Sequence, residues 1–119
     1  MLGVTRSTNA PEQIPDAVER QVSAYTAGDL EGFLFCFAED VVVEDAEGNV
    51  RSTGRDALRE SSGQLLAERP DQEYEIVARI RVGSWVVDKE RINGTPSGDT
   101  RAIASYHLDG VIDRARFLA

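Results

Sequence analysis

The chain has 119 residues, 41% of them hydrophobic and 29% charged, which is typical of a single soluble globular domain. Its net charge of −8 argues against a nucleic-acid partner, because phosphate contacts require a basic surface. The one cysteine, Cys36, excludes an internal disulfide and fits a reducing compartment. No apolar run has the length of a membrane span and no signal peptide is recognisable, so we expect a cytoplasmic protein without a membrane partner.

The N-terminal part predicts a flexible arm and two helices. Residues 1–13 lack periodicity and are expected to form the arm, and residues 14–119 are expected to form one domain. The first helix carries an apolar stripe at helical spacing and ends at Gly28, after which Asp29 can cap a second helix. The second helix repeats apolar residues at i, i+3, i+4 and i+7, namely Leu30, Phe33, Leu34 and Phe37.

A short strand and a third helix are predicted next. Residues 41–45 are rich in β-branched side chains, and alternation places Val41, Val43 and Asp45 on one face. Residues 46–49 read as a turn. Thr53 and Asp56 resemble a capping box that opens a helix, whose apolar face carries Leu58, Leu65 and Leu66 and is interrupted by Ser61 and Ser62.

The rest of the chain predicts a run of strands. Apolar and charged residues alternate between residues 74 and 82, so one face of this strand should be buried: Tyr74, Ile76, Ala78, Ile80 and Val82. Residues 84–92 form a second long strand, followed by a loop over 93–98. Residues 99–108 and 111–118 are joined by Asp109-Gly110, which is a strong hairpin signal.

Three motifs together resemble a known family. They are Ala27-Gly28-Asp29-Leu30-Glu31, the segment from Phe37 to Asp45, and Gly54-Arg55-Asp56-Ala57-Leu58, with Tyr106 to Asp113 closing the chain. They look like the NTF2-like superfamily, in its SnoaL-like and ketosteroid-isomerase-like branch, over about residues 14–119. This resemblance implies a cystatin-like α+β fold: three N-terminal helices on a curved, mainly antiparallel mixed sheet that encloses a cone-shaped pocket. It also implies a homodimer formed through the outer face of the sheet.

The resemblance gives Asp45 a candidate role. In ketosteroid isomerases the acid at the end of the first strand is the general base, and that position falls on Asp45. The oxyanion donors of those enzymes fall on Gln21 and near Ala104, so both are replaced here. One hypothesis makes Asp45 a proton-transferring carboxylate whose pKa is raised in an apolar pocket. The alternative is a solvated aspartate that caps the turn after the strand.

Further polar residues are candidates for the pocket. Gln21 places an amide within an apolar helix stripe, where it either meets a ligand or bonds a neighbouring group. Asp88 and Glu90 share a strand face with Val86; they either enter the pocket or pair with Arg79, Arg81 or Arg101. The full predicted substrate-binding set is Gln21, Tyr25, Phe37, Ser62, Asp88, Glu90, Tyr106 and Phe117.

Other residues fit an interface or the core. His107 lies on the opposite strand phase from Tyr106, and Trp85 and Val87 would form an apolar patch on the outer sheet face, which suggests dimerisation. Cys36, between two phenylalanines, is expected to be a small buried side chain. No phosphate loop, metal cluster or Ser-His-Asp set is recognisable, so neither a metal nor another cofactor is expected.

Two functions therefore follow from the sequence. The first is a cofactor-independent acid/base enzyme of the isomerase, dehydratase or hydrolase type, which binds a small apolar molecule and uses Asp45. The second is a non-catalytic ligand-binding or dimerisation module of the same fold.

Overall fold

The computed structural model describes residues 16–95 and 98–118. The predicted arm, residues 1–13, lies outside the described residues. Three helices precede or interrupt the sheet: α1 (Ala17–Thr26), α2 (Leu30–Leu34) and α3 (Arg55–Glu68). The six strands are β2 (Phe37–Glu44), β3 (Val50–Thr53), β4 (Glu73–Val82), β5 (Trp85–Thr95), β6 (Gly98–Asp109) and β7 (Val111–Leu118).

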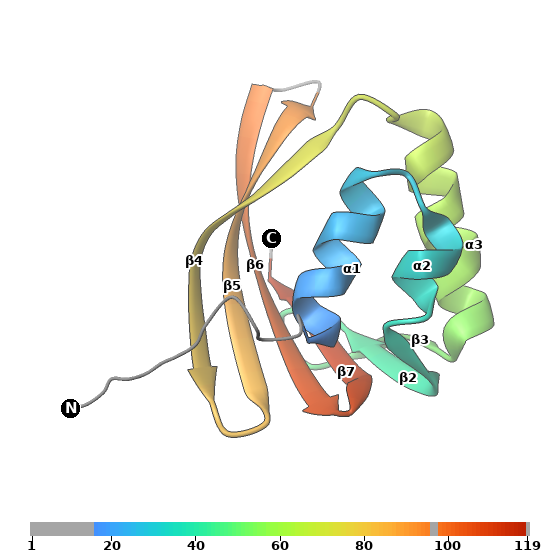
Figure 1. Ribbon diagram of the computed structural model, residues 1–119, viewed down its shortest axis with the longest axis vertical. Coiled ribbons are helices and arrows are strands. Elements are labelled where there is room, and N and C mark those ends of the chain that lie inside the picture. Colours follow the sequence, from blue (N-terminus) through green and yellow to red (C-terminus); the bar gives the residue numbers. More distant parts are fainter. Residues whose placement is uncertain (1–15, 96–97, 119) are drawn as a thin grey trace.

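The strands form one mixed sheet with the order β3-β2-β7-β6-β5-β4. The β2–β7 pair is parallel, and every other neighbouring pair is antiparallel. Figure 1 shows the long strands bowed around α1, with α2 and α3 lying beside it on the same side of the sheet. The side that faces the helices is called the concave face below, and the opposite side the convex face. This arrangement confirms the predicted α+β class.

Local signals in the sequence fix the first two helices. Asp16 and Glu19 form a capping box at the start of α1, and the carboxylates of both pair with Arg81 of β4. Asp29 caps α2 through the backbone N–H of Gly32 at 3.0 Å. Because Arg81 lies on the concave face, these contacts also hold the start of α1 over the sheet.

The hydrophobic core lies between the helices and the β2–β7–β6 part of the sheet. Its aromatic side chains pack in sequence from α1 towards β2, with the Tyr25 and Phe33 ring centroids 5.0 Å apart and those of Phe33 and Phe37 4.9 Å apart. Val18 and Val41 are completely buried beside them. Cys36 is also buried, as predicted, and its burial raises the pKa of the thiol.

Several predicted boundaries are wrong. The second helix ends at Leu34, and Phe37 begins β2, although its ring is buried as the helical spacing required. The N-cap of α3 is Gly54, at a φ of 96°, and Thr53 instead closes β3, a strand that the sequence did not predict. Leu65 is exposed, because α3 covers the sheet mainly through Leu58 and Ser62.

The buried face predicted for β4 is wrong in its second half. Tyr74 and Ile76 lie on the concave face, but an irregularity in register follows Ile76. From there on, Arg79 opposes Asp88 on the concave face, and Ile80 and Val82 are exposed on the convex face. An extra residue in one strand shifts the alternation by one position, so every later side chain changes face.

Within the residues described, none of the helices combines the length and the apolar character needed to cross a lipid bilayer.

Candidate functional site

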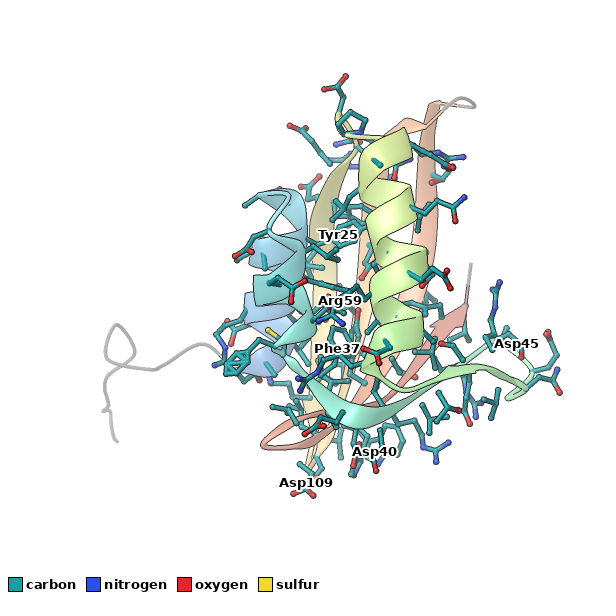
Figure 2. All side chains as sticks on the ribbon, turned by 90° about the vertical axis from the view of Figure 1, so that its right-hand side faces the viewer. Tyr25, Phe37, Asp40, Asp45, Arg59 and Asp109 are labelled. Carbon is teal, nitrogen blue, oxygen red and sulfur yellow. The ribbon has the colours of Figure 1, made fainter. Side chains whose placement is uncertain are left out.

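The structure contradicts the inward orientation predicted for Asp45. Its carboxylate accepts hydrogen bonds from the backbone N–H groups of Glu47 and Asn49, at 3.0 and 2.9 Å, and from the Asn49 amide at 3.2 Å. These hydrogen bonds, chiefly that from the Asn49 backbone, lower the pKa of Asp45 below its ordinary value. Figure 2 shows Asp45 at the β2–β3 turn, well away from Tyr25 and Phe37. The geometry is that of the alternative considered above, a turn-capping aspartate.

The physical reason is that β2 ends one residue earlier than predicted. Glu44 is its last residue and lies on the convex side, where it pairs with Arg114 at 2.5 Å and with Arg116 at 3.1 Å. Asp45 is therefore no longer part of the alternating strand. Its side chain satisfies the backbone of the turn instead of following the phase of Val41 and Val43.

Carboxylates do enter the concave face, but from β5. The β5–β6 register places Val86, Asp88 and Glu90 opposite Tyr106, Ala104 and Ala102, and these side chains point towards the helices. Asp88 is completely buried and forms a two-pronged ion pair with Arg79, at 2.6 and 2.8 Å. Asp88 therefore lies on the predicted inward face and also forms the predicted alternative, the cross-strand ion pair with Arg79.

Glu90 is the unusual member of this group. Only 8% of its surface is exposed, and its carboxylate forms no ion pair with any residue in 16–95 or 98–118. Burial, and then the negative charge of Asp88, raise the pKa of Glu90 to about 7, against smaller lowering effects of Tyr106 and Arg79. A carboxyl group in this condition exchanges its proton near neutral pH, which suits general acid and base chemistry.

Tyr106 and Gln21 adjoin Glu90 from two other elements. The Gln21 amide donates a hydrogen bond to the Tyr106 hydroxyl at 3.2 Å, and both side chains are buried. The Tyr106 hydroxyl also interacts with the Glu90 carboxylate. Burial and the charge of Glu90 raise the pKa of Tyr106 well above its ordinary value, so this phenol stays protonated and can serve as a hydrogen-bond donor.

Tyr25 and Tyr74 extend the cluster towards the β5–β6 loop. Their ring centroids are 5.2 Å apart in an edge-to-face arrangement, and their hydroxyl groups interact. The Tyr74 hydroxyl donates to the Gln72 side-chain oxygen at 3.2 Å, while the Gln72 Nε2 is buried without a partner. A buried donor of this kind is costly unless water or a ligand accepts its hydrogen bond.

The concave face is more deeply buried at one end than at the other, and the less buried end, towards the β5–β6 loop, is called the open end below. Its residues near the β4–β5 and β6–β7 turns are buried, including Val86 and Tyr106. Towards the β5–β6 loop the inward-facing residues are only partly covered, and Phe117 is 39% exposed. Glu90 lies between these two regions, on the side of Asp88 that is nearer the open end.

The remaining predicted substrate-binding residues have different surroundings. Phe117 lies on the concave face at the open end, with its ring centroid 6.2 Å from that of Tyr106. Ser62 is buried on α3, and Phe37 is a core residue next to Phe33. Their part in binding a ligand stays a prediction, as it does for Gln21, Tyr25, Asp88, Glu90 and Tyr106.

Two of the surface hollows that the described residues form lie elsewhere. One, of about 860 Å³, lies between α1, α2 and the β6–β7 turn and includes Arg20, Phe35, Cys36 and Val111. The other, of about 390 Å³, lies between α2 and the start of α3. Neither includes Glu90 or its neighbours, so the cone-shaped pocket expected on the concave face is not one of these hollows.

The convex face carries the residues expected there. His107 shares its phase with Ile103 and Ser105, and its Nδ1 lies 2.7 Å from the Asp113 carboxylate. Trp85 is 47% exposed and stacks edge-on against His107, with ring centroids 4.8 Å apart. Among the described residues there is no group of three or more His, Cys, Asp or Glu side chains arranged to hold a metal ion.

Comparison with known proteins assigns the chain to a family. The model of the SnoaL-like domain family matches residues 18–116, and the chain therefore belongs to this family. The matched range contains Gln21, Asp88, Glu90 and Tyr106. The resemblance inferred from the sequence motifs is thereby confirmed.

Solved structures share the fold at low sequence identity. An uncharacterised cystatin-fold protein of Novosphingobium aromaticivorans is 22% identical, with a TM-score of 0.78 over 87% of this chain and 95% of the other. A candidate polyketide cyclase of Sinorhizobium meliloti is 24% identical, with a TM-score of 0.75 over 87% and 94%. SalBIII, an epoxide hydrolase/cyclase-like enzyme of pyran ring formation in the polyether salinomycin, is 20% identical, with a TM-score of 0.72 over 86% of each chain.

Sequence reasoning missed two members of the cluster, because Gln72 and Tyr74 were not considered as site residues. Arg79 was named as a possible partner of Asp88 or Glu90, but the alternation predicted for its strand did not place it on the concave face. Tyr74 shares the strand phase of Ile76, and Gln72 lies two residues before Tyr74, just ahead of β4, so the alternation could have placed both on the concave face. For Arg79 no local signal was available, because the irregularity after Ile76 reverses the phase.

Proposed function

We propose that the protein binds a small molecule on the concave face and transfers a proton to or from it through Glu90. The observation that carries the proposal is a carboxyl group that is nine-tenths buried, has no ion-pair partner among the described residues and has a pKa of about 7. Tyr106, held by Gln21, is the hydrogen-bond donor next to it. The proposal replaces Asp45 with Glu90 as the acid/base group and needs no cofactor.

The reaction class that fits this arrangement is proton abstraction next to a carbonyl group. The ionised Glu90 would take the proton, and the Tyr106 phenol would move its one O–H from the Glu90 carboxylate to the substrate oxygen on which negative charge develops. Proton transfer of this kind is shared by isomerisation and dehydration. A candidate polyketide cyclase and an epoxide hydrolase/cyclase-like enzyme share the fold, and this supports an enzymatic function by analogy alone.

A general assay can test this proposal before the natural substrate is known. Small cyclic ketones in D₂O exchange their α-protons when a base removes them, and ¹H NMR follows the loss of signal. We expect the purified protein to accelerate this exchange, with a rate that rises with pH through about 7 as Glu90 ionises. Glu90→Gln should abolish the acceleration.

Asp45→Asn is the matched control, because it removes the other carboxylate that the sequence pointed to. It should leave the exchange rate unchanged, since Asp45 lies at the β2–β3 turn. Equal rates for the wild-type protein and Glu90→Gln would overturn the proposal. In that case the non-catalytic, ligand-binding alternative would be the better interpretation.

We also propose that the chain forms a homodimer through the convex face. Six large apolar side chains of β4, β5 and β6 are between 37% and 71% exposed on that face, and apolar patches of this extent are typical of interfaces. They are Val77, Ile80, Val82, Trp85, Val87 and Ile103. Light scattering coupled to size-exclusion chromatography measures the mass directly, and a monomer at all concentrations would contradict this proposal.

A further inference from the structure

We propose that the ligand of the concave face is a small organic cation, such as a tertiary or quaternary ammonium compound, whose charge lies against Glu90. This inference rests on the proposed function, because it names the class of molecule that the same site would take. It extends the earlier hypothesis, in which the ligand was simply small and apolar.

The first argument for a cationic ligand is the balance of charge on the concave face. Asp88 and Arg79 neutralise each other in a two-pronged ion pair, with Asp88 completely buried. Glu90 comes next along β5 on the same face and has no cation of its own among the described residues. When Glu90 ionises, the group as a whole carries one uncompensated negative charge in a poorly hydrated place. A ligand cation would supply the missing charge.

Charged groups of the neighbouring elements do not supply it. On β4, Arg79 is engaged with Asp88, and Arg81 with Asp16 and Glu19 at the start of α1. The groups that face Glu90 from β4 and β6 are the phenols of Tyr74 and Tyr106, and Tyr25 of α1 adjoins Tyr74. All three phenols are uncharged at neutral pH, because burial raises the pKa of each.

The second argument for a cationic ligand is the presence of aromatic rings next to Glu90. Tyr74 opposes Ile92 and Ile76 opposes Glu90, so Tyr74 and Glu90 are diagonal neighbours on one face of the β4–β5 pair. Tyr25 packs edge-on against Tyr74, and Phe33 lies 5.0 Å from Tyr25, measured between ring centroids. A carboxylate flanked by tyrosine rings is the combination that binds alkylammonium groups, because the ring faces attract the cation and its alkyl groups cover them.

The open end of the concave face favours a small ligand over a charged peptide. Glu90 is 8% exposed, whereas the inward residues nearer the β5–β6 loop are only partly buried. A lysine side chain attached to a polypeptide would bring polar backbone into this partly apolar entrance. A free alkylammonium ion needs no such contacts. A metal ion fits poorly, since the described residues offer no set of three ligating groups.

The experiment compares choline with its neutral isostere 3,3-dimethylbutan-1-ol, which has the same shape and no charge. Isothermal titration calorimetry and ¹H NMR line broadening measure both affinities between pH 5 and 9. At pH 8 we expect choline to bind at least about 10-fold more tightly than the neutral compound. Below the pKa of Glu90, the affinity for choline should fall about 10-fold per pH unit, because the proton and the cation compete for one carboxylate.

Two variants sharpen the comparison. Glu90→Gln keeps the shape of the side chain and should make the affinity for choline independent of pH and close to that of the alcohol. Tyr74→Leu should lower the affinity for choline more than the affinity for the alcohol. An alcohol that binds as tightly as choline, or the absence of binding by both, would overturn the cation proposal.

The outcome is separable from that of the proposed function. A ¹³C NMR titration of the Glu90 carboxyl group reports its protonation without any ligand. If the pKa of Glu90 is near 7 but choline binds no more tightly than the neutral alcohol, the cation proposal is refuted and the proton-transfer proposal stands. A titration at an ordinary carboxylate value, together with ketone exchange that does not depend on Glu90, would refute both.

Discussion

The two faces of the β4–β5 pair carry charged and apolar residues in an unusual distribution. On the concave face, the Arg79–Asp88 ion pair and Glu90 lie in a largely buried environment. On the convex face, Ile80 and Val82 are 63% and 71% exposed. Globular domains place apolar side chains inside and charges outside, so a sheet that partly reverses this order gives up stability for another purpose. The concave charges mark the candidate site, and the convex apolar residues mark a candidate interface.

Removing the buried carboxylate of the concave ion pair should have the largest effect. Asp88→Asn leaves Arg79 without its partner in a mostly buried position, and we expect a loss of about 3 kcal/mol or more in the free energy of unfolding. Glu75→Gln is the matched control, because it breaks the Arg91–Glu75 pair between the same two strands on the convex side. This exposed pair should contribute less than about 1 kcal/mol. Urea denaturation measures both, and equal losses would contradict the contrast between the faces.

The pH dependence of stability should reveal Glu90. Its pKa is about 7 in the folded protein and near 4.5 in the unfolded chain, so the folded state binds more protons between these values. Stability should therefore fall as pH rises from about 4.5 to 7, by roughly 3 kcal/mol for this group. Glu90→Gln removes that dependence. Its free energy of unfolding should therefore fall less between pH 5 and pH 8 than that of the wild-type protein. Urea denaturation of both proteins at the two pH values is the measurement, and an unchanged difference would argue against a raised pKa.

Polar substitutions on the convex face should break the proposed homodimer without unfolding the subunit. We expect the double change Trp85→Ser and Val87→Ser to weaken dimerisation at least about 100-fold, since aromatic anchors dominate interface energies. Phe35→Ser removes an exposed aromatic side chain at the end of α2, away from this face, and should leave the mass unchanged. Light scattering measures the molar mass of the wild-type protein and of both variants. Dissociation of Phe35→Ser to a monomer would show that the interface lies elsewhere.

Changing Asp45 should have the smallest effect. Asp45→Ala removes the acceptor of the backbone N–H groups of Glu47 and Asn49, so the β2–β3 turn should loosen. Because the pKa of Asp45 is lowered in the folded state, its contribution to stability is present at neutral pH and is lost as pH falls through that lowered value. We expect a small fall in melting temperature at pH 7 that disappears in acid. A rise in melting temperature would indicate that the carboxylate is strained instead of stabilising.

The sequence was informative wherever local chemistry decides structure. Gly28 and Asp29 predicted the break between the first two helices, and the hairpin across Asp109-Gly110 was predicted from two residues. The motifs from Ala27 to Leu58 were sufficient to recognise the family, because its members share the helix and strand signals that build the fold. The phase of Val86, Asp88 and Glu90 was also predicted, since β5 keeps its alternation through this segment.

The sequence alone thus determined the class of fold, the order of its elements apart from β3, and the shared face of Asp88 and Glu90 on β5. Only the tertiary structure decided that Asp45 caps a turn, that Arg79 turns inward to neutralise Asp88, and that Glu90 is left without an ion-pair partner among the described residues. The reason is physical. Helix caps and tight turns depend on neighbours in the chain, whereas strand endings, bulges and the cost of burying a charge depend on residues brought together from distant segments.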